Sequence, residues 1–362
     1  MILIVGGGIA GLALAARLHR LGLPCELVER DPAWSTVGGG ITLYPNGLRA
    51  LRAVGVATEV EARGARLDRL RVLDRTGRLL SERPGDAWAG VGATVMIDRQ
   101  VLQTVLRGVA AAVPTRLGVG VASISTGEPD GRAAVVFSDG TRGRYDLVVG
   151  ADGIRSSVRG LCFDPVRPRP VGQTYWRTAR RVELVDCATM MVDADRYVAV
   201  MPLGGGVSYL AWQVHAATPF DDPTEGRIAR LRARFGDFGE PAASALASLR
   251  EDAELHFGPA EELVIAAWHR GPVVLIGDAA HACSPTLAQG GSLAVEDAVV
   301  LAEELARDVD RETALAAFVA RRKPRVDWVR ERTHHEIEQL NRGADHLAER
   351  TEQVRTVLER AI

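Results

Sequence analysis

Three glycine-containing motifs have residue types and positions that could bind the phosphate and hydroxyl groups of a nucleotide cofactor. They are Gly6 to Gly11, Gly150 to Gly153 and Gly277 to His281. Each follows a short run of aliphatic or β-branched residues, which predicts a buried strand. Each motif is therefore expected to place a polar backbone turn at the end of a strand. One such turn is a weak indicator, whereas three in this order predict a common site.

The first motif has the spacing G-x-G-x-x-G between a predicted strand and a predicted helix, with glycines Gly6, Gly8 and Gly11. Glycines at these positions permit a tight turn, close approach of a pyrophosphate and tight packing of the helix on the strand. The helix N-terminus offers free N–H groups and the positive end of a dipole. Glu29 ends the next strand 18 residues after Gly11, where a carboxylate can bind ribose hydroxyls. The motif predicts a dinucleotide but leaves NAD and FAD open.

The third motif favours a flavin. Asp278 follows a strand and can bind a ribityl or ribose hydroxyl, although alone it could merely cap a turn. Twelve residues after Gly277 the sequence Gln289-Gly290-Gly291-Ser292 enters a helix. Glycines at a helix N-terminus expose N–H donors, and the dipole there stabilises the negative charge of a reduced flavin.

The second motif, Asp152-Gly153, is followed by Arg155 and Arg159. It could be a simple Asp-Gly turn. With two arginines near a cofactor pyrophosphate, we expect instead a role in binding the cofactor or a nicotinamide nucleotide.

Composition indicates an ordinary globular protein of 362 residues, 47% apolar and 25% charged. The net charge of -2 provides no general attraction to nucleic acid or membranes. Lys323 is the only lysine, and the four cysteines lack the spacing of a metal site, so no metal is expected. The chain opens into an apolar strand without a signal-peptide pattern and contains no run of membrane-spanning length. We therefore expect a cytoplasmic protein.

Apolar periodicity predicts a βαβ opening over residues 1–30, with its helix from Leu12 to Leu21. The further predicted elements are helices at 45–63, 99–113 and 224–236, a hairpin at 67–83, strands over 115–149, antiparallel strands at 171–184, 188–201 and 207–215, a strand at 273–276, and a helix from its N-cap Ser292 to Leu305. The charged last 50 residues have apolar positions at helical spacing and are expected to present a solvated face. We predict an FAD-binding domain from residues 1–165 and 271–362, the latter with carboxy-terminal helices, and a substrate-binding β-sheet domain from residues 166–270. The substrate pocket is expected between them.

With these motifs the chain resembles the class A flavoprotein monooxygenases, the single-component, FAD-dependent aromatic hydroxylases. The matching segments are Gly6 to Gly11 with Glu29, Asp98-Arg99 with Leu102, Gly150 to Ser156, Trp176-Arg177, Gly277 to His281, Pro285, Gln289 to Gly291, and Glu296 to Ala298. The resemblance implies a Rossmann-like FAD-binding domain with an inserted antiparallel sheet, as in p-hydroxybenzoate hydroxylase, and a carboxy-terminal helical segment. It also implies hydroxylation of an electron-rich aromatic or heteroaromatic small molecule with NAD(P)H and O2, through a flavin C4a-hydroperoxide.

The resemblance assigns the cofactor residues along most of the chain. Glu29 would bind the adenosine ribose, Arg99 and Asp278 the pyrophosphate and ribityl parts, and the backbone near Val121 the adenine. Pro285 would lie against the flavin beside the substrate. The full set expected to bind FAD is Gly6, Gly8, Ile9, Ala10, Gly11, Glu29, Arg30, Arg99, Val121, Asp152, Asp278, Gly290, Gly291 and Ser292.

Within the family, the segments at 39–47, 198–209 and 284–290 are most similar to the urate and salicylate hydroxylases. Tyr209 falls where that group has a substrate-facing tyrosine. Where the urate enzymes have a substrate arginine, this chain has Tyr197, with Arg196 beside it. Tyr197, Met201, Tyr209 and Gln213 alternate along two strands and could line one face.

The candidates for catalysis are Tyr209, Tyr197, His215 and Pro285, with His256 a second possible base and Tyr44 a weaker pocket residue. Both tyrosines could equally be ordinary strand aromatics. His281 is expected to serve packing or hydrogen bonding within the cofactor motif.

Several alternatives stay open on the sequence. The same flavin chemistry could give epoxidation or Baeyer–Villiger insertion on a non-aromatic or quinone-like substrate, or the chain could be a non-catalytic FAD-binding protein. A short-chain dehydrogenase is excluded because no tyrosine has a lysine four residues away. The preference for NADH or NADPH and the choice between monomer and homodimer are not encoded in these motifs.

Overall fold

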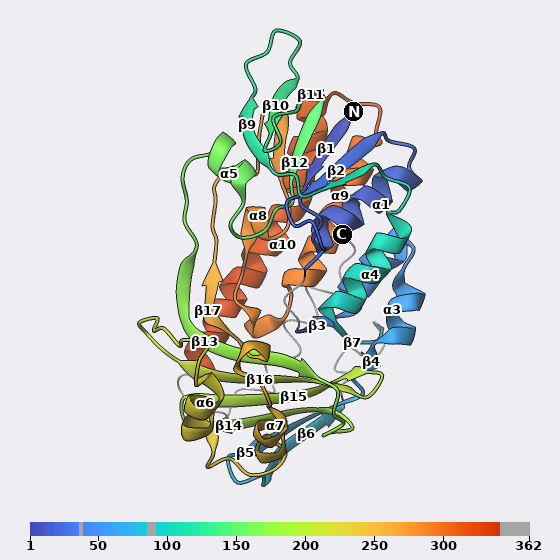
Figure 1. Cartoon of the computed structure of the whole chain (residues 1–362). Helices are drawn as coiled ribbons and strands as arrows, with labels where there is room; N and C mark the ends of the chain where they lie inside the picture. Colours follow the sequence, from blue (N-terminus) through green and yellow to red (C-terminus); the bar gives the residue numbers. More distant parts are fainter. Residues whose placement is uncertain (36–38, 85–91, 341–362) are drawn as a thin grey trace.

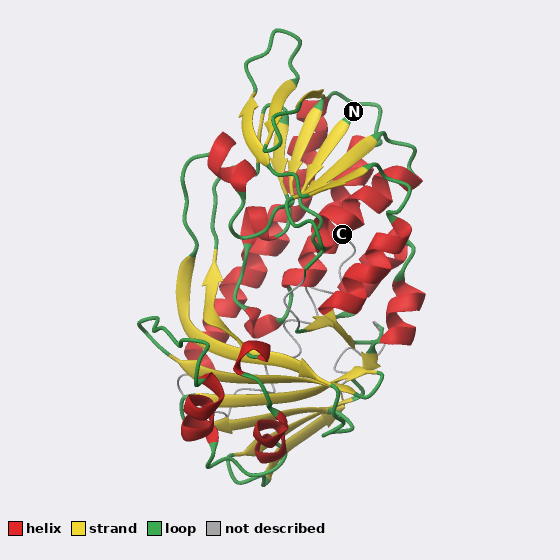
Figure 2. Ribbon diagram, viewed as in Figure 1, coloured by secondary structure: helices red, strands yellow, loops and turns green. Residues whose placement is uncertain are grey.

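The computed structural model describes residues 1–35, 39–84 and 92–340. Two sheets lie at opposite ends of the molecule with a layer of helices between them (Figure 1). Figure 2 shows the same arrangement by secondary structure. The predicted helical pattern beyond residue 340 lies outside the described residues.

The first sheet is a mostly parallel sheet of the doubly wound type. In spatial order its strands are β18 (His269–Arg270), β19 (Val273–Leu275), β12 (Leu147–Gly150), β1 (Ile2–Val5), β2 (Cys25–Glu29) and β8 (Thr115–Leu117). Only the pairing of β18 with β19 is antiparallel. All four residues of β1 and of β12 are buried, as expected for strands covered on both faces.

Helices pack against this sheet and supply the middle layer. They are α1 (Ile9–Arg20), α2 (Pro45–Val54), α3 (Ala57–Arg63), α4 (Arg99–Val109), α5 (Ser157–Cys162), α8 (Asp278–His281), α9 (Gly290–Leu305) and α10 (Arg311–Leu340). The predicted single helix at 45–63 is wrong, because Gly55 adopts a left-handed conformation and ends α2. The prediction of Ser292 as an N-cap is also wrong. Helix α9 begins at Gly290 after the cap residue Gln289, which leaves Ser292 buried in the first turn.

The second sheet has seven strands. Its order is β17 (His256–Glu262), β13 (Arg169–Arg180), β16 (Val207–His215), β15 (Arg196–Gly204), β14 (Ala188–Asp193), β5 (Arg69–Asp74) and β6 (Leu79–Pro84). The strand expected at 188–201 is two strands, because the chain turns at residues 194–195. The predicted hairpin at 67–83 is confirmed as β5 and β6, and β5 pairs with β14. This hairpin from the first part of the chain thus completes the second sheet.

One face of the second sheet packs on its own apolar core. Trp176 and Trp212 from the sheet contact Leu231 and Phe235 of α6 (Arg227–Phe235), and α7 (Ala242–Ser248) covers the same core. The opposite face is turned to the helical layer (Figure 2).

Shorter elements complete the described structure. They are β3 (Gly40–Leu43), β7 (Val95–Asp98) and β4 (Ala65–Arg66) in one small sheet, β9 (Val121–Ser125), β10 (Ala133–Phe137) and β11 (Arg142–Tyr145) in another, and the 3₁₀ turns η1 (Asp252–Glu254) and η2 (Pro285–Leu287). None of the described helices is long and apolar enough to cross a membrane.

A buried cluster of charges joins α9 to α10. Arg322 forms an ion pair with Glu296 at 2.7 Å and donates a hydrogen bond to Asp297 at 2.8 Å, and these three side chains are fully buried. Arg325 adds a second bond to Glu296, at 2.7 Å. The expectation that the charged carboxy-terminal segment is a solvated face is therefore wrong for this part of α10.

The cluster also affects acid stability. Burial alone would raise the pKa of Asp297, but the ion pairs with His281 and Arg322 outweigh it and lower the pKa to about 2. A carboxylate with a depressed pKa stabilises the fold above its unfolded pKa of about 4, and this contribution disappears as the pH falls toward 2.

We expect Arg322→Met to lower the free energy of unfolding by about 3–5 kcal/mol, because two buried carboxylates lose their shared partner. Denaturant unfolding of the FAD-loaded protein measures this. The control Arg52→Met removes an exposed guanidinium 3.8 Å from Glu61, and should cost less than about 1 kcal/mol. Equal stability of the two variants would contradict the assigned role of the cluster.

Candidate functional site

The three glycine motifs meet at the carboxyl ends of β1, β12 and β19. The Ala151 N–H donates to the Val5 carbonyl at 2.8 Å, and the Ile276 N–H donates to the Gly150 carbonyl at 3.0 Å. Gly6 has φ +107°, and a Cβ there would lie 2.5 Å from the Ala151 oxygen. Side chains are therefore excluded where the first motif touches the second. Strand β1 lies between β2 on one side and β12 on the other, so the strand order reverses its direction at β1. In α/β sheets, ligands bind at the carboxyl ends of the strands beside such a reversal.

A cavity opens at this edge of the sheet. It is lined by Val5, Gly6, Gly7, Gly8, Ile9, Val28, Glu29, Arg30, Asp31, Trp34, Ser35, Arg99, Gln103, Val119, Gly120, Val121, Ala151, Asp152, Gly153 and Ser157. Eight of the predicted cofactor residues are among them: Gly6, Gly8, Ile9, Glu29, Arg30, Arg99, Val121 and Asp152. The sequence reasoning did not single out Trp34 or Gln103. The Gln103 amide donates to the Gly7 carbonyl at 3.1 Å, and the Trp34 ring lies against Gly7.

Glu29 lies at the floor of the cavity, at the end of β2. Its two carboxylate oxygens accept from the Gly7 N–H at 2.6 Å and the Asp31 N–H at 2.8 Å. These bonds fix the carboxylate beside the glycine turn and leave lone pairs for hydroxyl donors. A cradle without side chains, a helix N-terminus and an acidic acceptor together fit the adenosine and pyrophosphate parts of FAD.

The glycines of the first motif have separate tasks. A Cβ at Gly11 would lie 1.9 Å from the Gly6 oxygen, so Gly11 permits the close packing of α1 on the turn. A Cβ at Gly8 would meet no atom within 4 Å, so Gly8 keeps space open beside the cavity.

The side chains of the second motif and of the residues after it bond mainly to other parts of the protein. The Asp152 carboxylate accepts from the Ser156 hydroxyl at 2.5 Å and from the Ser157 N–H at 2.7 Å, at the start of α5. Arg155 pairs with Glu261 at 2.7 Å. Buried Arg159 donates to the carbonyls of Ala279 and Ile154, at 2.9 and 2.7 Å.

Neither arginine lines the cavity, although Asp152, Gly153 and Ser157 of the same segment do, so the expected role in binding the cofactor or a nicotinamide nucleotide stays a prediction. Arg159 ties the second motif to α8 in the third.

The third motif contains a buried residue that packs inside the protein, His281, and an exposed carboxylate, Asp278. His281 Nε2 lies 2.5 Å from Asp297 Oδ2, and its ring packs on Trp268 at 4.8 Å between centroids, which confirms the packing role predicted for it. Asp278 is exposed at the first position of α8. Gly277 has φ +57° and a Cβ there would lie 3.1 Å from the Ala10 side chain. Ala10 of the first motif and the third motif are therefore in direct contact.

Helix α9 begins at Gly290 and Gly291, next to β3. A Cβ at Gly291 would lie 2.3 Å from Ile41 Cδ1, so a side chain there would require the Ile41 side chain to move. Ser292 is buried, and its hydroxyl lies 2.4 Å from the position of a Cβ at Gly47. The start of α9 is thus a crowded helix terminus whose N–H groups lack intrahelical partners.

The open face of the second sheet carries the predicted substrate residues. Tyr197 is opposite Gln213, and Met201 is opposite Tyr209. Paired residues of antiparallel strands share a face, so the predicted alignment of the four side chains is confirmed. The sheet register adds residues to this face that were not in the predicted catalytic set: Tyr175, Arg177 and Ala211, with Ala199 from β15.

Arg177 is the cation of this face. It lies near Tyr209, whose pKa is raised by burial and partly lowered again by the charge of this arginine. Tyr209 in turn packs on Gly40, where a Cβ would lie 2.9 Å from its ring. His256 pairs with Arg177 across β17 and β13, and burial followed by the arginine charge lowers the pKa of its imidazole. Both effects favour the neutral form of the His256 imidazole.

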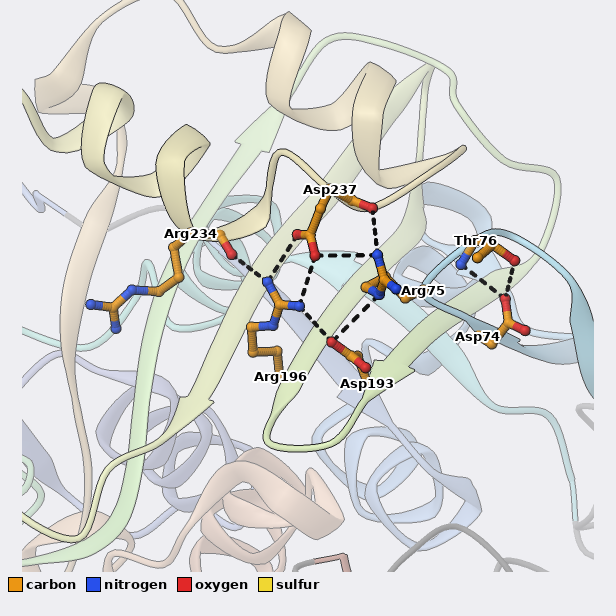
Figure 3. Close-up of polar contacts among 7 residues, drawn as sticks. All are labelled: Asp74, Arg75, Thr76, Asp193, Arg196, Arg234 and Asp237. Carbon is orange, nitrogen blue, oxygen red and sulfur yellow. Dashed lines mark hydrogen bonds and ion pairs between the residues drawn. The ribbon is translucent and has the colours of Figure 1, made fainter.

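Arg196, next to Tyr197, is directed away from that face. Figure 3 shows its guanidinium between Asp193 and Asp237, with a further bond to the Arg234 carbonyl. Arg75 of the β5–β6 hairpin pairs with the same two carboxylates. Arg196 thus fastens the outer loops of the sheet and is not available as a substrate arginine.

Gln173 connects the open face to the Pro285 turn. Its buried side-chain oxygen accepts from the hydroxyls of Ser284 at 2.9 Å, Thr286 at 3.1 Å and Tyr175 at 3.2 Å. Pro285 is the first residue of η2 and lies between two of these donors. The two layers are therefore joined beside the residue expected to contact the flavin.

Two candidates lie at the margin of the site: His215 is on the same face of β16 as Gln213, opposite Gln173 at the end of the strand, and Tyr44 is outside the sheet. His215 is exposed at the last position of β16, with its ring over Gly172. Tyr44 is the residue before α2 and is partly buried against the main core. Among the histidines of the second sheet, His256 is the one paired with Arg177.

The fold and the cofactor cavity define a class A type of flavoprotein, and comparison with known proteins supports this. A family model described as an FAD binding domain matches residues 1–333. The chain is 35% identical to the aurachin C monooxygenase/isomerase of Stigmatella aurantiaca, over 90% of this chain and 86% of the relative. It is 33% identical to a 2-heptyl-3-hydroxy-4(1H)-quinolone synthase of Pseudomonas aeruginosa, over 92% and 87%.

Solved structures have the same fold. Klebsiella pneumoniae HpxO complexed with FAD and uric acid superposes with a TM-score of 0.87 at 24% identity, over 99% of this chain and 92% of that one. Pseudomonas aeruginosa PqsL gives a TM-score of 0.81 at 24% identity, over 99% of both chains.

The chain belongs to the family of FAD-binding class A flavin monooxygenases. It is an oxidoreductase with FAD as cofactor and NAD(P)H as cosubstrate.

The glycine geometry predicts different effects for two similar substitutions. Gly11→Ala should lower the melting temperature of the apoprotein, because its methyl group collides with the Gly6 backbone. Gly8→Ala should leave apoprotein stability unchanged and weaken FAD binding at least tenfold, because its methyl group enters the space of the pyrophosphate. Differential scanning fluorimetry and FAD titration measure the two properties.

The control for these variants is Gly108→Ala, at an exposed position within α4 where a Cβ meets nothing. It should stabilise the protein by up to about 1 kcal/mol and leave FAD binding intact. FAD affinity of wild-type strength in Gly8→Ala would contradict the assignment of the cavity.

Asp278→Ala should lose most of its FAD affinity without loss of apoprotein stability, because an exposed carboxylate at this helix start is free to bind cofactor hydroxyls. The flavin content of the purified variant and an FAD titration measure this. Exposed Asp308 offers a control, Asp308→Ala, which should retain FAD. Tight FAD retention in Asp278→Ala would refute its role.

Proposed function

We propose that the enzyme hydroxylates a planar, electron-rich N-heteroaromatic compound of the 4-quinolone class. The observation that carries this proposal is the open sheet face, where Tyr175, Tyr197 and Tyr209 surround the small side chains of Ala199 and Ala211. Aromatic walls around a small-residue floor suit a flat ring system, which stacks on or meets the edges of tyrosine rings.

The charges on this face suit a ring that is activated by losing a proton. A 4-quinolone is electron-rich at the carbon next to its carbonyl when its enol is deprotonated. Arg177 would stabilise the developing oxyanion, and His256, opposite it on β17, would accept the proton. When bound, FAD reduced by NAD(P)H would activate O2, of which one atom enters the substrate and the other leaves as water. The protein's own task is to orient the ring, exclude water and hold its negative charge.

The relatives are consistent with this substrate class. The name of the 33% identical Pseudomonas aeruginosa relative gives a 3-hydroxylated 4(1H)-quinolone as its product. Urate is disfavoured for this chain because Tyr197 replaces the expected substrate arginine and the neighbouring Arg196 is held by Asp193 and Asp237.

The proposal also assigns the two domains, the cellular compartment, the oxidant and the oligomeric state. Residues 1–165 and 271–362 would hold FAD, and residues 166–270, with β5 and β6 added, would hold the substrate. We place the reaction in the cytoplasm, with O2 as oxidant, in a monomer or homodimer.

The experiment is a screen of 4-quinolones, aminobenzoates, phenols and purines for stimulated NAD(P)H oxidation, with product mass and NMR. We expect 4-quinolones to give the largest stimulation, with a mass gain of one oxygen and hydroxylation at the ring carbon next to the carbonyl. Stimulation only by purines or simple phenols would refute the proposed class. An epoxide or a ring-expanded product of the same mass would establish the alternative oxygen-insertion outcome.

Arg177→Met should raise the KM for the best substrate about 10- to 100-fold, the loss expected for a hydrogen bond to a charged group. FAD content should not change. The matched control is Arg180→Met on the same strand but the opposite face, where the guanidinium pairs with Glu254. An unchanged KM in Arg177→Met would remove this arginine from substrate binding.

A further inference from the structure

The first motif contains a glycine, Gly7, that neither its spacing nor its backbone requires. Gly7 occupies a variable position of G-x-G-x-x-G, and its backbone is not left-handed, unlike that of Gly6. A Cβ at Gly7 would lie 2.3 Å from Cζ3 and 2.9 Å from Cη2 of the Trp34 ring. The missing side chain therefore makes room for the edge of this ring.

Trp34 itself has an unusual backbone. Its φ of +56° lies in the left-handed region, which bulky side chains rarely adopt. Such a conformation persists only where the surrounding structure fixes it. Here the Asp31 carboxylate accepts from the N–H groups of Ala33 at 2.7 Å and Ser35 at 3.1 Å, on either side of Trp34. The Asp31 N–H is in turn bound to Glu29, so the loop that carries the ring is anchored to the carboxylate expected to bind ribose.

One side of α4 completes the surroundings of the Trp34 ring. Arg99, Gln103 and Arg107 follow one another at intervals of four residues and therefore lie on the same side of the helix. Arg99 and Gln103 line the cofactor cavity, and Gln103 binds the Gly7 carbonyl. The Arg107 guanidinium lies over the Trp34 ring, 4.7 Å from its centroid, which is a cation–π contact.

Trp34 thus presents an aromatic surface to the cavity from a fixed position. The residue lines the cavity and is only partly buried. Its ring edge meets Gly7 beside Glu29, whose Oε2 lies 3.3 Å from the same Cβ position. An aromatic ring beside the ribose carboxylate can cover the adenosine end of the cofactor, and this contact has to break before the cofactor leaves.

We propose that Trp34 retains bound FAD by closing the cavity beside Glu29, and that Arg107 is the positioning residue that holds the ring there. The glycine at position 7 is, in this proposal, an adaptation to the ring rather than to the cofactor. The inference depends on FAD binding and is independent of the proposed substrate class.

The first test is Trp34→Asn, which removes the ring and tolerates a left-handed backbone. FAD release should become about tenfold faster, and FAD affinity should fall by a similar factor, because the loss of a contact acts mainly on dissociation. FAD-loaded protein is mixed with an excess of a second apo-flavoprotein that traps released FAD, and flavin fluorescence follows the release. No substrate or turnover is needed.

The second test is Gly7→Ala, which probes the contact between the glycine turn and the ring. In the wild-type chain the added methyl group displaces the ring, so FAD release should again be faster. In the Trp34→Asn background the same substitution should have little further effect, since the ring atoms that it would meet are gone. Two substitutions that act through one contact are expected to be non-additive.

Arg107→Met should speed FAD release about two- to fivefold, as expected for one lost cation–π contact at an exposed site. The matched control is Arg270→Met, whose guanidinium lies 5.7 Å from the Phe163 ring outside the cavity. Thr189→Val controls for general destabilisation, because the buried Thr189 hydroxyl donates to the Cys187 carbonyl in the second sheet. Both controls should release FAD at the wild-type rate.

Wild-type release from Trp34→Asn, or equally fast release from Thr189→Val, would overturn the proposal. Full additivity of Gly7→Ala and Trp34→Asn would overturn the assigned contact between the ring and the turn. An unchanged rate in Arg107→Met would overturn the positioning role of Arg107. If Gly7→Ala does not fold, Trp34→Asn and Arg107→Met still test the retention and the positioning separately.

Discussion

The geometry of the cofactor site depends on two carboxylates, Glu296 and Asp297, that are buried side by side on α9 with Arg322 between them. Two such charges are costly inside a protein unless each is paired with an opposite charge and hydrogen bonded. Asp297 meets this requirement with His281 and with the N–H of Gly277 at 2.9 Å, and so sets the position of the third motif. Glu296 meets it with Arg325 and Asn46, and so sets the position of α2. The cofactor motifs lie on elements that these charges align.

Much of the cofactor site could be predicted because its determinants are local. A glycine turn after an apolar strand specifies its own conformation, and the alternation of Tyr197, Met201, Tyr209 and Gln213 specifies a common face. Other features depend on partners distant in sequence. The sequence of α10 would be the same whether Arg322 were solvated or buried. Its burial depends on the packing of α9 against α10, which is a contact between distant parts of the chain. The long-range contacts of Arg155 and Arg159 could not be predicted for the same reason, since their partners lie more than 100 residues away.

The second sheet separates stability from specificity by using its two faces differently. Trp176 and Trp212 fill the core beneath α6, while their neighbours Tyr175, Arg177 and Gln213 point to the helical layer. A substitution on one face leaves the side chains of the other in place, so the substrate face can vary among relatives while the core is kept. Gln173 is the exception, because its side-chain oxygen accepts hydrogen bonds from Tyr175 of the sheet and from Ser284 and Thr286 of the Pro285 turn. A substitution of Gln173 would therefore change the contact between the sheet and that turn.

The hairpin of β5 and β6 gives the chain a topology that limits how its parts can be exchanged. The second sheet is not one uninterrupted insert, because its last two strands at one side, β5 and the edge strand β6, come from residues 69–84, and Arg75 fastens them to Asp193 and Asp237. A chimaera that took only residues 166–270 from a relative would join a foreign β14 to the native β5. Recombination between members of this family therefore has to carry both segments together, and their edge residues are expected to change in concert.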